Sequence, residues 1–235
     1  MRLIIAAFAL AGMGASGPAV PVSATPVAVE LFTSQGCSSC PPADALVERL
    51  AREPNIVILT RPVTYWDRLG WKDTLAREEN TSLQRAYAAR GGEGSGVYTP
   101  QAVVQGVAAV VGSQELELRR LIVAEKRVPG PAISAAATAD GGRSVSLSKG
   151  ASAAADVLIV ALKGEVSVHI GAGENGGRTV HYTNVVLSET KVGRWTGVPA
   201  TIVVAGKVMK QAGADRYALI LRAGTAGRIV AARYL

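Results

Sequence analysis

Two cysteines separated by only two residues, Cys37 and Cys40, lie at a predicted strand-to-helix junction. The short apolar run Val27–Phe32 before them is typical of a buried strand, and Ala43–Arg52 after them has the periodicity of an amphipathic helix. A second buried strand is predicted over Ile56–Thr60. Strand, helix and strand in this order predict a parallel pair of strands with a right-handed crossover. The chain therefore begins as an α/β unit with its cysteine pair at the end of the first strand.

The next part of the chain continues with a predicted helix, a β-hairpin and another helix. With the first unit they give the order β-α-β-α-β-β-α, which matches a thioredoxin fold. In that fold a cis-proline precedes the hairpin and faces the disulfide, and Thr99-Pro100 stands at that place. We predict a thioredoxin-like α/β domain over residues 25–128. The predicted ranges are Thr81–Ala89, Gln101–Val104, Ala108–Val111 and Glu115–Lys126.

From Pro129 onward the sequence changes to short alternating segments separated by Gly-rich or Asp/Asn turns. Regular short strands of this kind predict an antiparallel, sandwich-like arrangement. The predicted fold class is thus a thioredoxin-like domain followed by a mainly antiparallel β domain over residues 129–235. The predicted strands are Ala132–Ala137, Ser144–Ser148, Val157–Leu162, Val166–Ile170, Val180–Leu187, Thr201–Val204, Tyr217–Arg222 and Ile229–Tyr234.

Residues 1–24 have the pattern of a signal peptide. One positive charge precedes the apolar run Leu3–Met13, and small residues at Val22 and Ala24 suit signal peptidase. The run is shorter than the roughly 20 residues that span a bilayer. An uncleaved anchor or a buried N-terminal strand is the alternative. We expect an exported protein, periplasmic or secreted, whose mature chain has no transmembrane segment.

The composition excludes several classes of protein. Of 235 residues, 49% are hydrophobic and 18% are charged, which is unlike a disordered chain. The net charge of +7 comes from scattered basic residues, whereas a nucleic-acid-binding protein concentrates them on one face. We therefore expect no nucleic-acid partner, while weak attraction to anionic membrane surfaces stays open.

The spacing of the two cysteines favours redox chemistry. In an oxidising compartment a nearby pair is usually a disulfide. A disulfide that encloses two residues adds little entropic stabilisation, and the helix N-terminus favours a thiolate. We predict that Cys37 is the exposed attacking thiol and Cys40 the resolving thiol of an exported thiol–disulfide oxidoreductase. It would need no organic cofactor and would act on a protein thiol or disulfide partner.

Two alternatives to this function remain. The chain could be a non-catalytic binding module that keeps the fold and a structural disulfide. It could instead be a copper(I)-binding chaperone, because copper(I) favours thiolates, although no methionine cluster supports this. We predict no metal site. A reduction potential separates an active disulfide from a structural one.

Residues at three strand ends are expected to cluster around the cysteines, because ligand sites in open α/β sheets favour such an edge. Tyr65 and Trp66 are predicted to line an apolar groove for a substrate peptide, and Asp67 to orient its backbone. Pro100 would present the substrate by holding the Thr99 backbone open for pairing. The alternative is that the two aromatic residues belong to the core and that Asp67 caps the following turn.

Glu30, on the first strand, has two interpretations. A buried acid near a resolving cysteine can accept its proton, with a pKa raised by desolvation. Glutamate is rarely buried, so we favour a side chain that faces outward.

The segment Gly171–Gly177 predicts a glycine-rich hairpin loop and lacks the Lys-Ser/Thr pair of a phosphate-binding loop. Its neighbours Glu174, Asn175 and Arg178 are expected to serve turn chemistry, with docking onto the thioredoxin-like domain or binding of a polar ligand as the alternative. The two histidines have no evident third ligand for a metal, so we expect surface imidazoles. These residues are His169 and His181.

The run ELFTSQGCSSCPPAD, residues 30–44, resembles the signature of a family of secreted, thioredoxin-like bacterial proteins of unknown function. The resemblance implies a thioredoxin-like domain with an additional β domain and no established reaction. At Thr64 the chain departs from the family pattern, which usually has an aspartate there. Three further blocks agree with the pattern: Tyr65–Asp73, Val97–Gln101, and Gly173–Val186.

Overall fold

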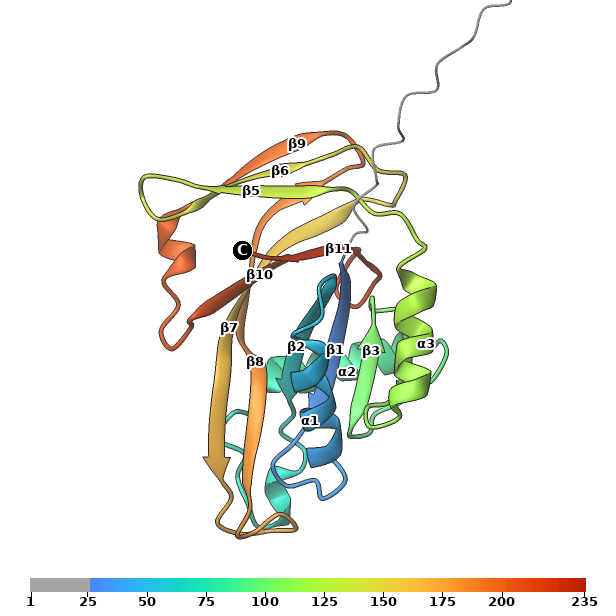
Figure 1. The fold of residues 1–235 in the computed structure, drawn as a ribbon, viewed down its shortest axis with the longest axis vertical. Helices are drawn as coiled ribbons and strands as arrows, with labels where there is room; N and C mark the ends of the chain where they lie inside the picture. The colour runs from blue at the N-terminus through green and yellow to red at the C-terminus, as the bar shows by residue number, and fades with distance from the viewer. Residues whose placement is uncertain (1–25) are drawn as a thin grey trace, which may run out of the picture.

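The computed structural model describes residues 26–235, so the predicted signal peptide, residues 1–24, lies outside the described residues. The fold is mixed α/β and is dominated by one eight-stranded sheet, with a three-stranded sheet laid across one end (Figure 1). In the part of the chain that the structure describes, no helix has both the length and the apolar character needed to cross a membrane.

The elements follow one another as strands and short helices. The strands are β1 (Val27–Thr33), β2 (Ile56–Pro62), β3 (Gln101–Val104), β4 (Ala108–Val111), β5 (Ile133–Ala137), β6 (Arg143–Leu147), β7 (Ala155–His169), β8 (Thr179–Trp195), β9 (Ala200–Val204), β10 (Arg216–Arg222) and β11 (Ile229–Tyr234). The helices are α1 (Pro41–Leu50), α2 (Glu78–Arg90) and α3 (Glu115–Glu125), with 3₁₀ turns η1 (Asp67–Leu69) and η2 (Gly206–Met209).

The large sheet has the strand order β11-β10-β7-β8-β2-β1-β3-β4. β1 and β2 are parallel, from Val27 opposite Ile56 to Thr33 opposite Pro62, and β3 runs antiparallel to β1. The carboxyl ends of β1 and β2 therefore meet at one edge of the sheet, where β3 begins. This is the edge at which the sequence predicted the site.

Alternate residues of β1 face opposite layers, as the period of a strand requires. Val27, Val29 and Leu31 pack under α1 and α3. Phe32, on the other face, packs against α2 residues such as Tyr87. All seven residues of β1 are buried, because the strand is central in the sheet and covered on both faces.

Strands from the second part of the chain extend the same sheet. The hairpin of β7 and β8 joins it where Thr60 of β2 lies opposite Val185 of β8, in parallel. The predicted division of Ala155–His169 into two strands is wrong. Gly164 lies within one continuous strand, and its backbone N–H donates to Asp215 Oδ1 at 2.6 Å. A glycine inside a strand need not end it.

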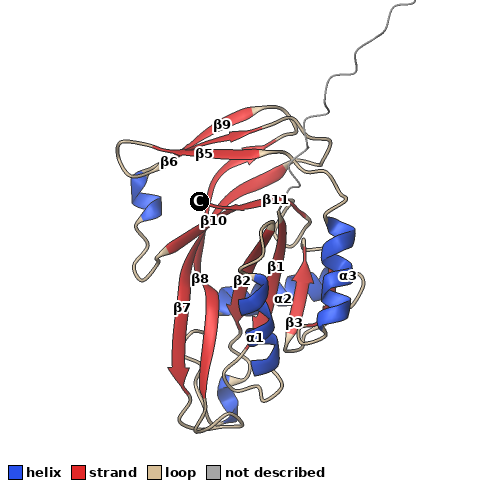
Figure 2. Cartoon of the chain, in the orientation of Figure 1, coloured by secondary structure: helices blue, strands red, loops and turns tan. Residues whose placement is uncertain are grey.

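The small sheet, β5-β6-β9, packs over the far end of β7, β8 and β10 (Figure 2). The core between the two layers contains the fully buried Trp195, with Val145 of β6 and Leu219 of β10. Strands thus form two layers at this end, and the larger layer is continuous with β1 and β2.

Candidate functional site

Cys37 and Cys40 form a disulfide at the junction between β1 and α1. The backbone N–H groups of Ala43 and Asp44 donate to the carbonyl oxygen of Cys40, which caps α1, and Pro41 occupies the first helical position. Proline is tolerated there because its missing N–H would have no partner in the helix. Both cysteines are 0% exposed, so the prediction that Cys37 is exposed is wrong: the surrounding segments cover the disulfide.

Trp66 contacts both the disulfide loop, residues 34–40 between β1 and α1, and Thr99, the residue before Pro100. A Cβ added to Gly36 would lie 3.2 Å from Trp66 Cβ, so Trp66 lies directly against the loop that leads into Cys37. Trp66 Nε1 donates to Thr99 Oγ1 at 2.8 Å. The Thr99–Pro100 peptide bond is cis. The contacts therefore bring together the three segments that the sequence predicted to cluster.

A groove of about 710 Å³ lies beside Trp66 and is lined by residues 64–69 together with Arg85 and Val97. Tyr65 and Trp66 line this groove while they also pack against the core residues of α2. Asp67 Oδ1 accepts a hydrogen bond from the backbone N–H of Asp73 at 3.1 Å. This contact fits the alternative role for Asp67, that of a turn cap.

The glycine-rich loop between β7 and β8 docks onto the disulfide loop. Asn175 Nδ2 donates to the carbonyl oxygens of Gln35 and Cys37 at 3.0 and 2.8 Å, and the residue is 1% exposed. The backbone N–H of Ser38 donates to Glu174 Oε2 at 3.0 Å. For Glu174 and Asn175 the preference for simple turn chemistry is therefore wrong, since both dock onto the segment around Cys37. Arg178 does serve the turn, because its Nη1 donates to Asn175 Oδ1 at 3.3 Å. Hydrogen bonding by the side chain and the backbone N–H of Ser38 lowers the pKa of Glu174.

Gln35, in the disulfide loop, forms hydrogen bonds with the segment that follows β2. Its backbone N–H donates to Asp73 Oδ2, and its Oε1 accepts from Trp71 Nε1, each at 2.8 Å. Trp71 in turn packs against Gly171, where an added Cβ would lie 3.0 Å from the indole. The disulfide loop is thus enclosed by the segment after β2 and by the β7–β8 loop.

Three buried titratable residues that were not predicted from the sequence, Asp44, Asp73 and Tyr182, lie on segments around the disulfide. Burial raises the pKa of Asp44, on α1, to about 8. It likewise raises the pKa of Asp73 to about 6. Burial and the charges of both aspartates raise the pKa of Tyr182 on β8. A signal for Asp44 was present, since it lies in the helical stripe of buried residues that also contains Ala43 and Val47.

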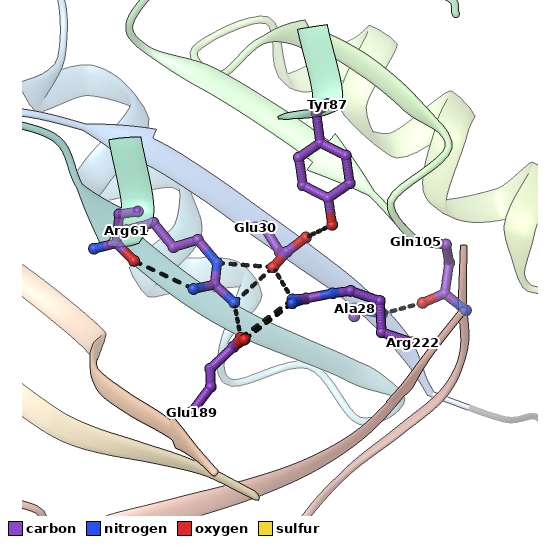
Figure 3. Close-up of polar contacts among 8 residues, drawn as sticks. Ala28, Glu30, Arg61, Tyr87, Gln105, Glu189 and Arg222 are labelled. Atoms are coloured by element: carbon purple, nitrogen blue, oxygen red, sulfur yellow. Dashed lines mark hydrogen bonds and ion pairs between the residues drawn. The ribbon is translucent and has the colours of Figure 1, made fainter. Parts of the chain in front are cut away.

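The expectation that Glu30 faces outward is wrong. Its carboxylate is fully buried and accepts hydrogen bonds from Arg61 Nε at 2.7 Å and Arg222 Nη2 at 2.8 Å (Figure 3). Tyr87 also donates to it. Glu189 closes the cluster by binding both guanidinium groups. Burial is tolerated because each charge has opposite partners.

The attraction of two arginines controls the charge of Glu189. Burial alone would raise its pKa, but the positive charges of Arg61 and Arg222 hold it at about 2. The same attraction, acting against desolvation, raises the pKa of Arg61. The ion pairs of the cluster join β1, β2, β8 and β10.

Both histidines are exposed. His181 Nδ1 lies 2.7 Å from Ser167 Oγ, and His169 Nδ1 lies 3.4 Å from Thr179 Oγ1. Within residues 26–235, no three His, Cys, Asp or Glu side chains are grouped as metal ligands would be.

The fold and the site together define a mixed α/β protein with a buried Cys-x-x-Cys disulfide between its first strand and first helix. The chain belongs to the family described as "Protein of unknown function (DUF1223)", whose profile matches residues 28–222. No curated protein matches the chain.

Two solved structures resemble the fold. Protein AGR_C_4864 from Agrobacterium tumefaciens is 31% identical, with a TM-score of 0.79 over 91% of this chain and 95% of that one. HBP35 of Porphyromonas gingivalis is 11% identical, with a TM-score of 0.55 over 90% of this chain and 74% of that one. The second likeness concerns the fold alone.

Proposed function

We propose that this chain is an exported thiol–disulfide oxidoreductase that acts on protein thiols or disulfides through Cys37 and Cys40. The observation that carries the proposal is the position of the disulfide, between the carboxyl end of β1 and the first turn of α1. The N-terminus of a helix stabilises a thiolate there and lowers the pKa of a free thiol. A thioredoxin-like core over residues 26–128 is part of this proposal.

The arrangement of the strands and helices supports that core. The sheet order β2-β1-β3-β4 places a parallel pair beside an antiparallel hairpin. α1 and α3 cover one face of these strands, and α2 covers the other. This is the arrangement that the order β-α-β-α-β-β-α predicts for a thioredoxin-like domain.

In the proposed reaction a substrate thiolate attacks Cys37 Sγ. The Cys37–Cys40 bond breaks, a mixed disulfide forms at Cys37, and Cys40 leaves as a thiolate; the reverse sequence reduces a substrate disulfide. The groove beside Trp66 and Tyr65 would receive the substrate chain next to Thr99 and Pro100. Its rim carries the exposed side chain of Leu69, which suits an apolar residue of a partner. The sulfur atoms carry the electrons, so no organic cofactor is needed.

The cellular setting of the proposal is the periplasm or the exterior. The N-terminal sequence has the pattern of a signal peptide, and a disulfide persists in oxidising compartments. These features agree with one another.

Two measurements test the proposed function. The reduction potential of the Cys37–Cys40 disulfide should lie above about −300 mV, because structural disulfides lie below that value. In the exporting cell, Cys40→Ala should accumulate mixed disulfides at Cys37 whose partners can be identified. A reduction potential below about −300 mV, together with no mixed disulfides in the Cys40→Ala variant, would contradict the proposal.

A binding module with an inert disulfide is the second candidate, and the complete burial of both cysteines favours it. In that case the groove of residues 64–69 would bind a partner without exchange. Reduction would then leave partner binding unchanged, whereas the oxidoreductase would exchange disulfides with its partner.

A further inference from the structure

Cys40 is enclosed and needs a proton when it leaves the disulfide. Its side chain is 0% exposed, so water does not reach the sulfur in this state. A buried thiolate without a positive partner is costly, and burial raises the pKa of such a thiol. Exchange at Cys37 therefore requires a nearby group that gives a proton to Cys40 as the bond breaks.

Glu30, the acid that the sequence offered for this task, is committed elsewhere. Its carboxylate is bound by Arg61, Arg222 and Tyr87 (Figure 3). These contacts occupy the carboxylate oxygens, so Glu30 is not free to serve Cys40. The proton donor must be another residue.

Asp44 meets the geometric requirement. Cys40 has helical backbone angles, and the backbone N–H of Asp44 donates to the Cys40 carbonyl oxygen, so the two residues are one turn apart on the same helix. Residues four apart lie on the same face, and helical side chains tilt toward the N-terminus. Helix geometry therefore places Asp44 on the face of α1 that carries Cys40, one turn away, and both residues are buried.

The Asp44 carboxyl forms no ion pair among the described residues. No hydrogen bond to its oxygens has good geometry there, although the Thr33 hydroxyl approaches it and lowers its pKa against the larger effect of burial. Buried polar groups are normally paired, so an unpaired buried acid calls for an explanation. Asp73 and Tyr182 are the titratable groups that face it from the neighbouring elements.

We infer that Asp44 is the proton donor and acceptor for Cys40 during disulfide exchange, an inference that rests on the proposed function. A substrate thiolate attacks Cys37 Sγ, the Cys37–Cys40 bond breaks, and the electron pair of that bond stays on Cys40 Sγ. The Asp44 proton moves to this sulfur and leaves a carboxylate, so the single negative charge passes from the substrate to Asp44. In the reverse step the carboxylate takes the proton back as Cys40 attacks.

The protonation state of Asp44 agrees with this role. Burial raises its pKa to about 8 while the disulfide is intact, so the carboxyl holds its proton at neutral pH. A buried thiol has a pKa above its usual value of about 8.5, so transfer from the acid to the thiolate is favourable.

The test measures how fast dithiothreitol reduces the disulfide in the mature chain between pH 6 and pH 10, with each rate divided by the dithiothreitol thiolate concentration. In the wild type this rate constant should be level below pH 8 and fall above it. Asp44→Asn should be slower by roughly tenfold or more at pH 7 and show no fall, since general acids contribute about 10²-fold or more. Glu48→Gln, one turn further along α1 and partly exposed, should keep the wild-type profile.

The outcomes separate this inference from the proposed function. An unchanged rate and profile in Asp44→Asn would overturn the role of Asp44 and leave the oxidoreductase in place. A wild-type disulfide that dithiothreitol does not reduce would overturn both. Should Asp44→Asn fail to fold, infrared spectroscopy of the wild type decides: a protonated buried carboxyl band at pH 7 that titrates near pH 8 supports the inference, and its absence overturns it.

Discussion

Asn175 donates its side-chain amide to the carbonyl oxygen of Cys37 at 2.8 Å, across 138 positions of the sequence. The same amide binds the carbonyl oxygen of Gln35 at 3.0 Å. A loop from the second half of the chain therefore fixes the backbone of the cysteine that we propose as the attacking thiol. Movement of this loop is a direct way to uncover the disulfide.

Asn175→Ala should loosen this cover. It removes two buried hydrogen bonds and leaves the Gln35 carbonyl oxygen without that partner, while the Cys37 carbonyl oxygen keeps the Cys40 N–H; this costs about 1–3 kcal/mol of stability. The rate of disulfide reduction should rise about tenfold, because 1.4 kcal/mol of easier opening corresponds to a factor of ten. Asn184→Ala is the control, since Asn184 is also buried and makes two side-chain hydrogen bonds, to Tyr234 and Arg216. Equal acceleration in both variants would contradict a specific role for Asn175.

Glu174→Gln should make Cys37 more acidic in the reduced protein. The carboxylate binds the backbone N–H of Ser38, and its negative charge next to the motif disfavours a thiolate. Glutamine keeps the acceptor and removes the charge, so the pKa of Cys37 should fall by about half a unit to one unit. Alkylation rates against pH, measured in a Cys40→Ala background, give this pKa. Glu165→Gln, an exposed acid on β7, should leave it unchanged.

Glu30→Gln should destabilise the fold without reaching the disulfide. The substitution leaves Arg61 and Arg222 with Glu189 as their remaining acid in the cluster, and breaking a buried ion pair costs about 3–5 kcal/mol. Urea unfolding measures the loss. The exposed pair of Glu48 and Arg52 provides the comparison, where Glu48→Gln should cost about 0–1 kcal/mol. Similar losses in the two variants would show that the cluster does not hold the strands together.

Asp44→Asn should change how stability depends on pH. The folded-state pKa of about 8 lies above the ordinary value of 3.8, so the folded protein binds this proton more tightly than the unfolded chain. Stability therefore falls as pH rises from about 4 to about 8, by on the order of 5 kcal/mol for a shift of this size. The variant lacks this slope and should be the more stable protein at pH 8. Urea unfolding of the wild type and of Asp44→Asn at pH 5 and pH 8 measures this slope. An equal change in the free energy of unfolding of both proteins between the two pH values would contradict the prediction.

Local elements were predicted well because their signals are short-range. The hairpin strands Gln101–Val104 and Ala108–Val111 match their predicted ranges, and α3 ends one residue before its predicted end. The helix after Cys40 begins at Pro41, because proline is tolerated in the first turn of a helix. Periodicity and turn residues act over a few positions, so the sequence displays them directly.

The site was predicted less completely than the elements. The positions of Cys37, Trp66 and Thr99 near one sheet edge followed from the strand directions. Glu30 was misassigned because its face of β1 is covered by residues that arrive much later, including Arg222, 192 positions away. Asp44 was missed although its helical spacing marks a buried position, because aspartate is rarely left unpaired in a core.

The sequence by itself determined where the strands and helices form and that both cysteines lie at one strand–helix junction. Only the tertiary structure decided that β8 pairs with β2 and that the loop between β7 and β8 covers Cys37 through Asn175. It also decided that four charged side chains form one buried cluster: Glu30, Arg61, Glu189 and Arg222. The reason is physical. Backbone conformation responds to neighbouring residues, whereas pairing and burial depend on which distant segments cover a given face, and residue order alone does not display that.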